Sequence, residues 1–276
     1  MNEAHSEPIG GAAAEQLIAP LTELVIRAGE TILAVNRAAM KVDGKLDGSP
    51  VTEADLAADK IIAEGLAQIA PDIACLSEEC AHLAQPPCRG SFFLVDPLDG
   101  TKEFIAGRNE FTVNLALVSA GKPLLGLIGA PALGLVWRGL VGRGADRVTL
   151  AGTAIKSVEP IHTRPHPAPG QPWTVAVSRS HGDARSEAFI DKRPGAVRAQ
   201  LGSAVKFARV AEGAVDVYPR LGPTSEWDVA AGHAVVTAAG GKVTDSRGAE
   251  LHFGRKRENF IVPEFIAWGD PSAVSF

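Results

Sequence analysis

The chain has 276 residues, of which 46% are hydrophobic and 21% are charged, so it holds enough apolar material for a sizeable core and is not expected to be disordered. Its net charge of −5 argues against binding to nucleic-acid polymers, and three cysteines in so long a chain argue against a disulfide scaffold. There is no secretory signal pattern and no apolar run near the ~20 residues that span a membrane. We therefore expect a cytoplasmic protein, either free or resting on the inner face of the cell membrane, that acts as a monomer or a homodimer.

The first elements expected along the chain are two helices. Apolar residues recur at helical spacing from Pro20 to Met40, after residues 1–19, which we expect to be a loose leader or a frayed first turn. A polar, glycine-rich loop follows. The second helix has a clear start, because Thr52 can cap it and Asp55 stands three residues later, as in a capping box.

Strands are expected next, and mixed elements after them. The apolar, β-prone stretches that predict the first strands are 73–76, 91–95, 111–118 and 123–128, and the last two are joined by a turn at Ala120 and Gly121. Further short strands are expected over 134–150. The proline-rich run 160–172 is the best candidate for a linker. After it we expect a strand at 174–177 and helices at 203–212 and 225–239.

Acidic residues stand at the ends of four of these elements. Asp55 lies in the first turn of the second helix, Glu78 follows a short strand, Asp96 and Asp99 follow the most apolar strand, and Asp228 begins a helix. Each has a purely structural explanation, as a helix cap, a solvated turn, an Asx turn or a charge that favours a helix N-terminus. Together they are harder to explain in that way, because uncompensated carboxylates at the end of a buried strand are costly.

The segment from Asp96 to Thr101 has the composition of a metal site beside an anion site. Pro97 fixes one turn and Gly100 permits a tight one, so Asp96 and Asp99 can point to one place. Mg²⁺ prefers such oxygen ligands, and the backbone N–H groups of Gly100 and Thr101 suit an anion. Adjoining metal and anion sites are used to hydrolyse phosphate esters, where two metal ions ~4 Å apart activate a water and stabilise the leaving oxygen.

Four separated motifs resemble the inositol monophosphatase superfamily, the lithium-sensitive, Mg²⁺-dependent phosphomonoesterases that include the fructose-1,6-bisphosphatases and the bisphosphate nucleotidases. The motifs are Asp55, Leu76-Ser77-Glu78-Glu79, Asp96-Pro97-Leu98-Asp99-Gly100-Thr101 and Trp227-Asp228-x-x-Ala231. Within the superfamily, further stretches resemble the bacterial 3'(2'),5'-bisphosphate nucleotidases of the CysQ type. These stretches are Val51-Thr52-Glu53-Ala54-Asp55, Thr101-Lys102-Glu103-Phe104-Ile105, Ser178-Arg179-Ser180-His181, Gly202-Ser203-x-x-Lys206-Phe207 and Tyr218-Pro219-Arg220.

The resemblance implies a fold, a domain division and a metal site. The fold is an α+β, α/β layered sandwich with alternating α-β-α-β-α layers, in which residues 1–158 form a metal-binding domain and residues 159–276 a substrate-binding domain. Two Mg²⁺ ions are implied, with a third held more weakly through water near Glu78. Glu78, Asp96 and the carbonyl of Leu98 would hold the first ion, and Asp96, Asp99 and Asp228 the second.

The resemblance also implies catalytic and substrate-binding residues. Asp55 and Thr101, with Glu78, would be catalytic, because a threonine hydroxyl beside a carboxylate can orient the attacking water and take its proton. The implied substrate contacts are Glu78, Leu98, Asp99, Gly100, Thr101, His181, Ser203, Lys206, Arg220 and Asp228. Among these, the cationic Lys206 and Arg220 would meet a second phosphate.

The activity that follows from the resemblance is that of a 3'(2'),5'-bisphosphate nucleotidase in sulfur metabolism. Water would remove the 3'-phosphate of adenosine 3',5'-bisphosphate to give AMP, and the sulfated nucleotide would be a second substrate. Two alternatives stay open. One is an inositol-1-monophosphatase or a broader sugar phosphatase, and the other is a metal- and nucleotide-binding regulatory module without turnover.

Overall fold

The computed structural model describes residues 7–37, 39–44, 50–83, 90–179, 182–254 and 260–274. The helices of these residues are α1 (Gly11–Ala34), α2 (Glu53–Ile69), α3 (Thr101–Ile105), α4 (Ala184–Asp191), α5 (Val205–Ala211) and α6 (Glu226–Ala238), with the 3₁₀ turns η1 (Glu78–Leu83), η2 (Pro131–Leu133) and η4 (Pro271–Ala273). None of these helices is long and apolar enough to cross a bilayer.

The strands of the described residues form two large sheets and two small ones. The larger sheet holds, in spatial order, β3 (Ala74–Ser77), β4 (Ser91–Asp99), β5 (Thr112–Ser119), β6 (Lys122–Ala130), β7 (Leu135–Leu140), β8 (Gly144–Ala151) and β9 (Ala154–Ile161). The second holds β11 (Val197–Leu201), β10 (Thr174–Ser178), β12 (Val217–Arg220), β16 (Phe265–Trp268) and β14 (Lys242–Thr244). The small sheets pair β1 (Val42–Gly44) with β2 (Pro50–Thr52) and β13 (Thr224–Ser225) with β15 (Ile261–Val262).

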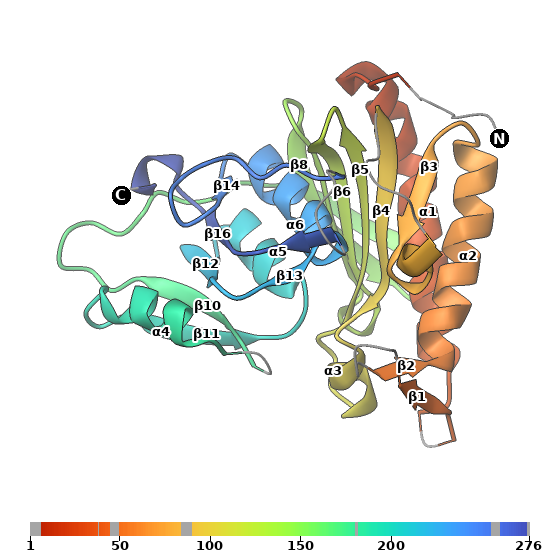
Figure 1. Cartoon of the computed structure of the whole chain (residues 1–276), viewed down its shortest axis with the longest axis horizontal. Helices are drawn as coiled ribbons and strands as arrows, with labels where there is room; N and C mark the ends of the chain where they lie inside the picture. The colour runs from red at the N-terminus through yellow and green to blue at the C-terminus, as the bar shows by residue number, and fades with distance from the viewer. Residues whose placement is uncertain are drawn as a thin grey trace.

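These elements stack in five layers, which confirms the alternating sandwich (Figure 1). Along β4 the side chains alternate between two cores, because successive residues of a strand face opposite sides. Phe93 and Val95 pack with α1 and α2, whereas Phe92 and Leu94 pack with α5 and α6. The second sheet closes the other side of α5 and α6, and Ile190 of α4 packs on its outer face.

The first helix starts and ends earlier than expected. α1 begins at Gly11, inside the segment for which we expected a loose leader or a frayed first turn, and it ends at Ala34 instead of Met40. Pro20 lies within it, where a proline normally breaks a helix. The alanine run 12–14 favours helix strongly, and Ala14 and Leu21 on either side of the proline are fully buried. Packing and propensity therefore outweigh the proline.

The second helix starts as the sequence predicts. α2 follows Thr52, whose hydroxyl accepts from the Ala54 N–H at 3.2 Å. Asp55 accepts in return from the Thr52 N–H at 2.8 Å, which completes the capping box. Ala58 and Ile62, four residues apart on one face of α2, are buried.

The expectation for Asp96 to Asp99 is met in part. The Asx turn at Asp96 forms, because its Oδ1 accepts from the Leu98 N–H at 3.1 Å, and Gly100 turns the chain with a φ of 87°. β4 stays extended through Asp99, and its pairing with β5 shifts register between Asp96 and Asp99. Such an irregularity lets a strand re-aim its side chains without ending. The predicted turn at Ala120 and Gly121 is confirmed, with φ of 49° and 77°.

The proposed domain division at residues 158 and 159 falls inside β9. The segment 162–173 after it has no regular structure but is held to the second sheet, since Arg164 pairs with Asp216 at 2.6 Å. The helices that follow belong to a core shared with the larger sheet, in which Phe207 packs with Phe92 and Leu94. The division into two domains, the oligomeric state and the location in the cell stay predictions.

Candidate active site

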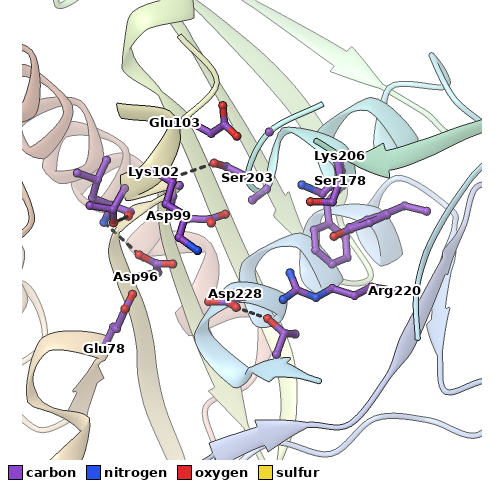
Figure 2. Close-up of a pocket in the computed structure, with 18 of the residues that line it drawn as sticks. Glu78, Asp96, Asp99, Lys102, Glu103, Ser178, Ser203, Lys206, Arg220 and Asp228 are labelled. Carbon is purple, nitrogen blue, oxygen red and sulfur yellow. Dashed lines mark hydrogen bonds between the residues drawn. The ribbon is translucent and has the colours of Figure 1, made fainter. Parts of the chain in front are cut away.

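A cavity of about 220 Å³ lies between the two large sheets and is lined from both halves of the chain (Figure 2). One wall comes from the end of β4 and the start of α3, and the other from α5, β12 and the start of α6. The predicted site residues that line it are Glu78, Asp96, Leu98, Asp99, Gly100, Thr101, Ser203, Lys206, Arg220 and Asp228. His181 lies outside the described residues.

Asp55 lies behind this lining and joins two helix starts. Its Oδ2 accepts from the Thr52 hydroxyl at 2.5 Å, and its Oδ1 accepts from the Thr101 hydroxyl at 3.0 Å. The Thr101 Oγ1 is also 3.2 Å from the Leu98 carbonyl. Asp55 is 2% exposed, so its carboxylate is out of water and its neighbours hold it in one orientation. The helix cap of α2 thus places a carboxylate against the hydroxyl that opens α3.

The end of β4 supplies two carboxylates and a carbonyl. Asp96 is buried, and its Oδ1 accepts from the Leu98 N–H at 3.1 Å. Asp99 faces the neighbouring strand β5, where Thr112 and Asn114 lie 3.4 Å and 3.3 Å from its Oδ2. The irregular pairing of β4 with β5 therefore turns both aspartates toward the cavity while the strand remains extended.

Asp228 reaches the cavity from the first turn of α6. Its carboxylate accepts from the Thr224 hydroxyl and, at 3.3 Å, from the Ser225 N–H. Ser225 and Asp228 form a capping box, as Thr52 and Asp55 do. The helix cap expected of Asp55 is thus confirmed, and Asp228, for which we expected only a charge that favours a helix N-terminus, is a capping residue as well. Capping does not exclude a further role, because a carboxylate has two oxygens and several lone pairs.

The acidic end of the cavity concentrates charge away from water. Burial raises the pKa of Asp96 well above its ordinary value, and the negative charges of Glu78, Asp99 and Asp228 raise it further. Burial and Asp228 also raise the pKa of Asp99, against the opposing influence of Lys206. Repulsion among buried carboxylates favours a bound cation, which would relieve it.

The donor chemistry of this end fits Mg²⁺, because every candidate ligand is an oxygen. In the residues that the structure describes, however, no three His, Cys, Asp or Glu side chains form a group able to hold an ion as they stand. The assignment of individual residues to metal ions stays a prediction.

The opposite end of the cavity is cationic. Lys206 of α5 is 4% exposed, and its Nζ lies 5.3 Å from the centre of the Tyr218 ring. Burial lowers the pKa of Lys206 to about 8, although the charge of Asp99 raises it. Arg220 of β12 is half-buried, and its Nη2 donates to the Pro223 carbonyl at 3.4 Å. Figure 2 shows Lys206 and Arg220 across the cavity from Asp96 and Glu78.

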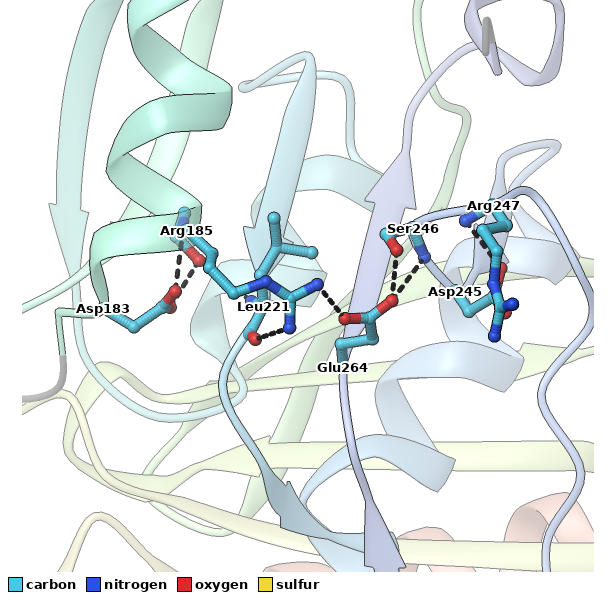
Figure 3. Close-up of polar contacts among 8 residues, drawn as sticks. Asp183, Arg185, Leu221, Asp245, Ser246, Arg247 and Glu264 are labelled. Carbon is cyan, nitrogen blue, oxygen red and sulfur yellow. Dashed lines mark hydrogen bonds and ion pairs between the residues drawn. The ribbon is translucent and has the colours of Figure 1, made fainter.

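Polar contacts hold the end of β12 in place beside Arg220 (Figure 3). The next residue, Leu221, is bonded on both sides: Arg185 donates to its carbonyl at 3.0 Å, and its N–H donates to the Ser186 hydroxyl at 2.9 Å. Arg185 also pairs with Glu264, whose carboxylate accepts from Ser246. The start of α4 thus fixes the strand that carries Arg220.

Ser203 does not present its hydroxyl to the cavity in the way the resemblance implies. Its Oγ lies 2.9 Å from the carbonyl oxygens of both Asp99 and Glu110, so it bonds to the backbone of the opposite wall. Its role in binding substrate stays a prediction.

Three residues at or beside the site were not predicted to have a role there. Tyr218 and Glu103 line the cavity and stand in stretches that carry the resemblance, so the resemblance could have pointed to them. Glu110 has no such signal, because its importance depends on contacts with residues more than 60 positions away.

Comparisons with known proteins agree with this geometry. The chain matches the model of the inositol monophosphatase family over residues 13–265. The 3'(2'),5'-bisphosphate nucleotidase CysQ of Escherichia coli O157:H7 is 40% identical over 251 residues, which cover 88% of this chain and 96% of that protein. CysQ from Bacteroides thetaiotaomicron has a similar structure, with a TM-score of 0.70 at 30% identity over 91% of this chain and 96% of that chain. An inositol monophosphatase from Zymomonas mobilis has a TM-score of 0.74 at 28% identity, over 95% of this chain and 96% of that chain. The chain therefore belongs to the inositol monophosphatase family.

Proposed function

We propose that the chain is a Mg²⁺-dependent 3'(2'),5'-bisphosphate nucleotidase that hydrolyses the 3'-phosphate of adenosine 3',5'-bisphosphate to AMP. The observation that carries the proposal is the division of one cavity into an acidic end, at Asp96 and Asp99, and a cationic end, at Lys206 and Arg220. A nucleotide with two phosphates needs both ends, one to hydrolyse an ester and one to hold the second phosphate. The likeness to CysQ proteins supports the same substrate, and the sulfated nucleotide would be a second one.

The acidic end would hold the metal ions on which this family depends. We assign Glu78, Asp96 and the Leu98 carbonyl to one Mg²⁺ and Asp96, Asp99 and Asp228 to a second, with a third weaker ion near Glu78. Bound Mg²⁺ stabilises negative charge on phosphoryl oxygens and lowers the pKa of water. Thr112 and Asn114 of β5 donate to one oxygen of the Asp99 carboxylate and so hold it in one orientation.

Proton transfer would use the Thr101–Asp55 pair. The Thr101 hydroxyl can accept a proton from the attacking water only if it passes its own to a base. The Asp55 Oδ1, at 3.0 Å, is such a base, and its other oxygen is fixed by the cap of α2. The N–H groups of Gly100 and Thr101, where the chain enters α3, would hold the scissile phosphate.

The second phosphate would lie against the cationic end. The buried ammonium of Lys206 binds an anionic group more strongly than a surface lysine does, because water competes less. The half-buried guanidinium of Arg220 supplies further donors. The strand that carries Arg220 is held by Arg185 and Ser186, so Arg220 is positioned before substrate arrives.

Purified protein assayed against adenosine 3',5'-bisphosphate, inositol 1-phosphate and fructose 1,6-bisphosphate, with and without Mg²⁺, tests the proposal. The expected result is Mg²⁺-dependent release of phosphate with the highest kcat/KM on the adenosine nucleotide. Faster hydrolysis of inositol 1-phosphate would favour the alternative of an inositol or sugar phosphatase, to which the likeness to the Zymomonas mobilis structure points. No turnover of any substrate would favour a binding module.

A further inference from the structure

The two walls of the cavity meet at a short seam formed by Glu110, Arg179, Gly202 and Ser203. Glu110 lies between α3 and β5, on the wall that carries the acidic end. Its Oε2 accepts from the Gly202 N–H at 2.8 Å and pairs with the Arg179 Nη1 at 2.7 Å. One carboxylate oxygen of the first half of the chain thus binds two groups of the second half.

The backbone on both sides of the seam is tightly fitted. A Cβ on Gly202 would lie 2.5 Å from the Glu110 carbonyl oxygen, and one on Gly100 would lie 2.1 Å from the Ser203 Oγ. Ser203 itself has φ of 48°, a left-handed conformation that is uncommon outside glycine. The surrounding contacts must hold this conformation, because it is not the one that serine prefers.

The seam sets the distance between the two ends of the cavity. On one side, Asp99 and Gly100 directly precede Thr101. On the other, Gly202 and Ser203 lead into α5, which carries Lys206 in its first turn. A shift at the seam would therefore move Lys206 relative to Thr101 without unfolding either wall.

We propose that Glu110 and Arg179 are positioning residues that hold the cationic end of the cavity in register with the acidic end. The inference rests on the proposed function, and it adds residues that touch neither the reacting phosphate nor the metal ions. Both side chains of this ion pair are partly buried, at 23% and 29% exposure, so each keeps some access to water when its partner is removed. Loss of the ion pair should change geometry more than folding.

The first experiment compares two substrates. Under the proposed function, adenosine 3',5'-bisphosphate would span both ends of the cavity, whereas 3'-AMP carries only the phosphate to be hydrolysed. Glu110→Ala should lower kcat/KM on the bisphosphate by roughly tenfold, mainly through KM, as expected for a lost charge-assisted contact. Hydrolysis of 3'-AMP should change less than about threefold. Glu110→Gln keeps an acceptor for the Gly202 N–H and should retain part of the selectivity.

Two further variants sharpen the comparison. Glu159→Gln removes an ion pair of equal length, between Arg147 and Glu159 on β8 and β9 at the far edge of the larger sheet, and should leave both rates unchanged. Arg179 also lies 3.6 Å from Glu103 and donates to the Gln200 carbonyl at 3.2 Å. Arg179→Ala and Glu110→Ala should therefore be less than additive when combined, because they share one ion pair. Equal losses on both substrates, or no loss on either, would overturn the proposal.

Hydrogen exchange tests the seam without any substrate. Glu110→Ala should speed amide exchange over 202–206, while Glu159→Gln should not. Unchanged exchange over 202–206 in Glu110→Ala would also overturn the proposal. A failure of the proposed function is seen separately, in the wild type alone, as an absent preference for the bisphosphate over 3'-AMP.

Discussion

At the scale of single residues, Asp96 is expected to affect turnover and stability in opposite directions. Asp96→Asn removes one charge from the acidic end but keeps an oxygen that can accept from the Leu98 N–H. Turnover should fall by far more than tenfold, a ~1.4 kcal/mol step, because cation binding loses its shared ligand. In EDTA the free energy of unfolding of the variant should be about 1 kcal/mol higher than that of the wild type, because repulsion from Glu78 and Asp99 is relieved. Steady-state rates with Mg²⁺ and urea unfolding in EDTA measure the two effects. Retained activity would refute the assignment of Asp96 to both metal ions.

Lys206 and Arg220 should control which substrate is used. Lys206→Ala or Arg220→Ala should cost ~1.5–3 kcal/mol on adenosine 3',5'-bisphosphate, roughly ten- to a hundredfold in kcat/KM. Hydrolysis of an inositol monophosphate should barely change, because it has no second phosphate to lose. Misfolding would lower both rates alike, so the ratio of the two rates is the measurement. Equal losses would speak against a second-phosphate site.

A site residue could be predicted from the sequence where a short motif determines its position, and not where contacts between distant parts of the chain determine it. Asp96, Asp99 and Asp228 stand in short motifs, so their approach to one cavity could be expected. The hydroxyl of Ser203 stands in such a motif too, yet it bonds across the cavity wall to Asp99 and Glu110. Nothing in the sequence relates Ser203 to Glu110, because that contact depends on how the two halves of the chain pack.

At the scale of elements, α6 is expected to make the protein sensitive to acid. His233 packs edge-on against Phe253, with ring centres 5.7 Å apart, and burial lowers its pKa to about 4. The unfolded chain takes up this proton below its ordinary pKa of 6.5, whereas the folded protein resists it until about pH 4. Stability present above pH 6.5 is therefore lost as the pH falls toward 4.

His233→Gln should remove this dependence, since glutamine does not titrate. Between pH 7 and pH 5 the free energy of unfolding of the wild type should fall by about 1 kcal/mol more than that of the variant, after allowance for the partial exposure of His233. Urea unfolding of both proteins at the two pH values measures the difference. Parallel losses in the two proteins would show that His233 is not responsible.

The elements differ in how far local sequence determines them. The start of α2 could be predicted, because Thr52 and Asp55 satisfy the first N–H groups within a few residues. The start of α1 could not, because Pro20 indicates a boundary that packing overrides. The continuation of β4 to Asp99 depends on pairing with β5, which Pro97 does not indicate, whereas the turn at Gly100 could be predicted.

At the scale of the molecule, α6 joins the two halves, and a small residue lets it do so. A Cβ on Gly126 of β6 would lie 2.3 Å from the Ala231 carbonyl oxygen of α6. Gly126→Ala should therefore destabilise the fold by about 2–3 kcal/mol, because a backbone atom cannot easily move away. Gly11→Ala, where a Cβ meets nothing within 4 Å, is the matched control and should change stability by less than about 0.5 kcal/mol. Thermal unfolding measures both, and equal melting temperatures would contradict tight packing of α6 on the sheet.

The position of α6 late in the chain has a consequence for synthesis. The strands of the larger sheet end at Ile161, but the helix that covers their second face is complete only at Ala238. At about 5–20 residues per second, a ribosome needs roughly 4–15 s to make the chain between these points. During that time Phe92, Leu94 and Trp137, fully buried in the finished protein, lack the helix that covers them. The nascent chain should therefore depend on chaperones until α6 emerges, and stalling the ribosome before residue 226 should leave it bound to them.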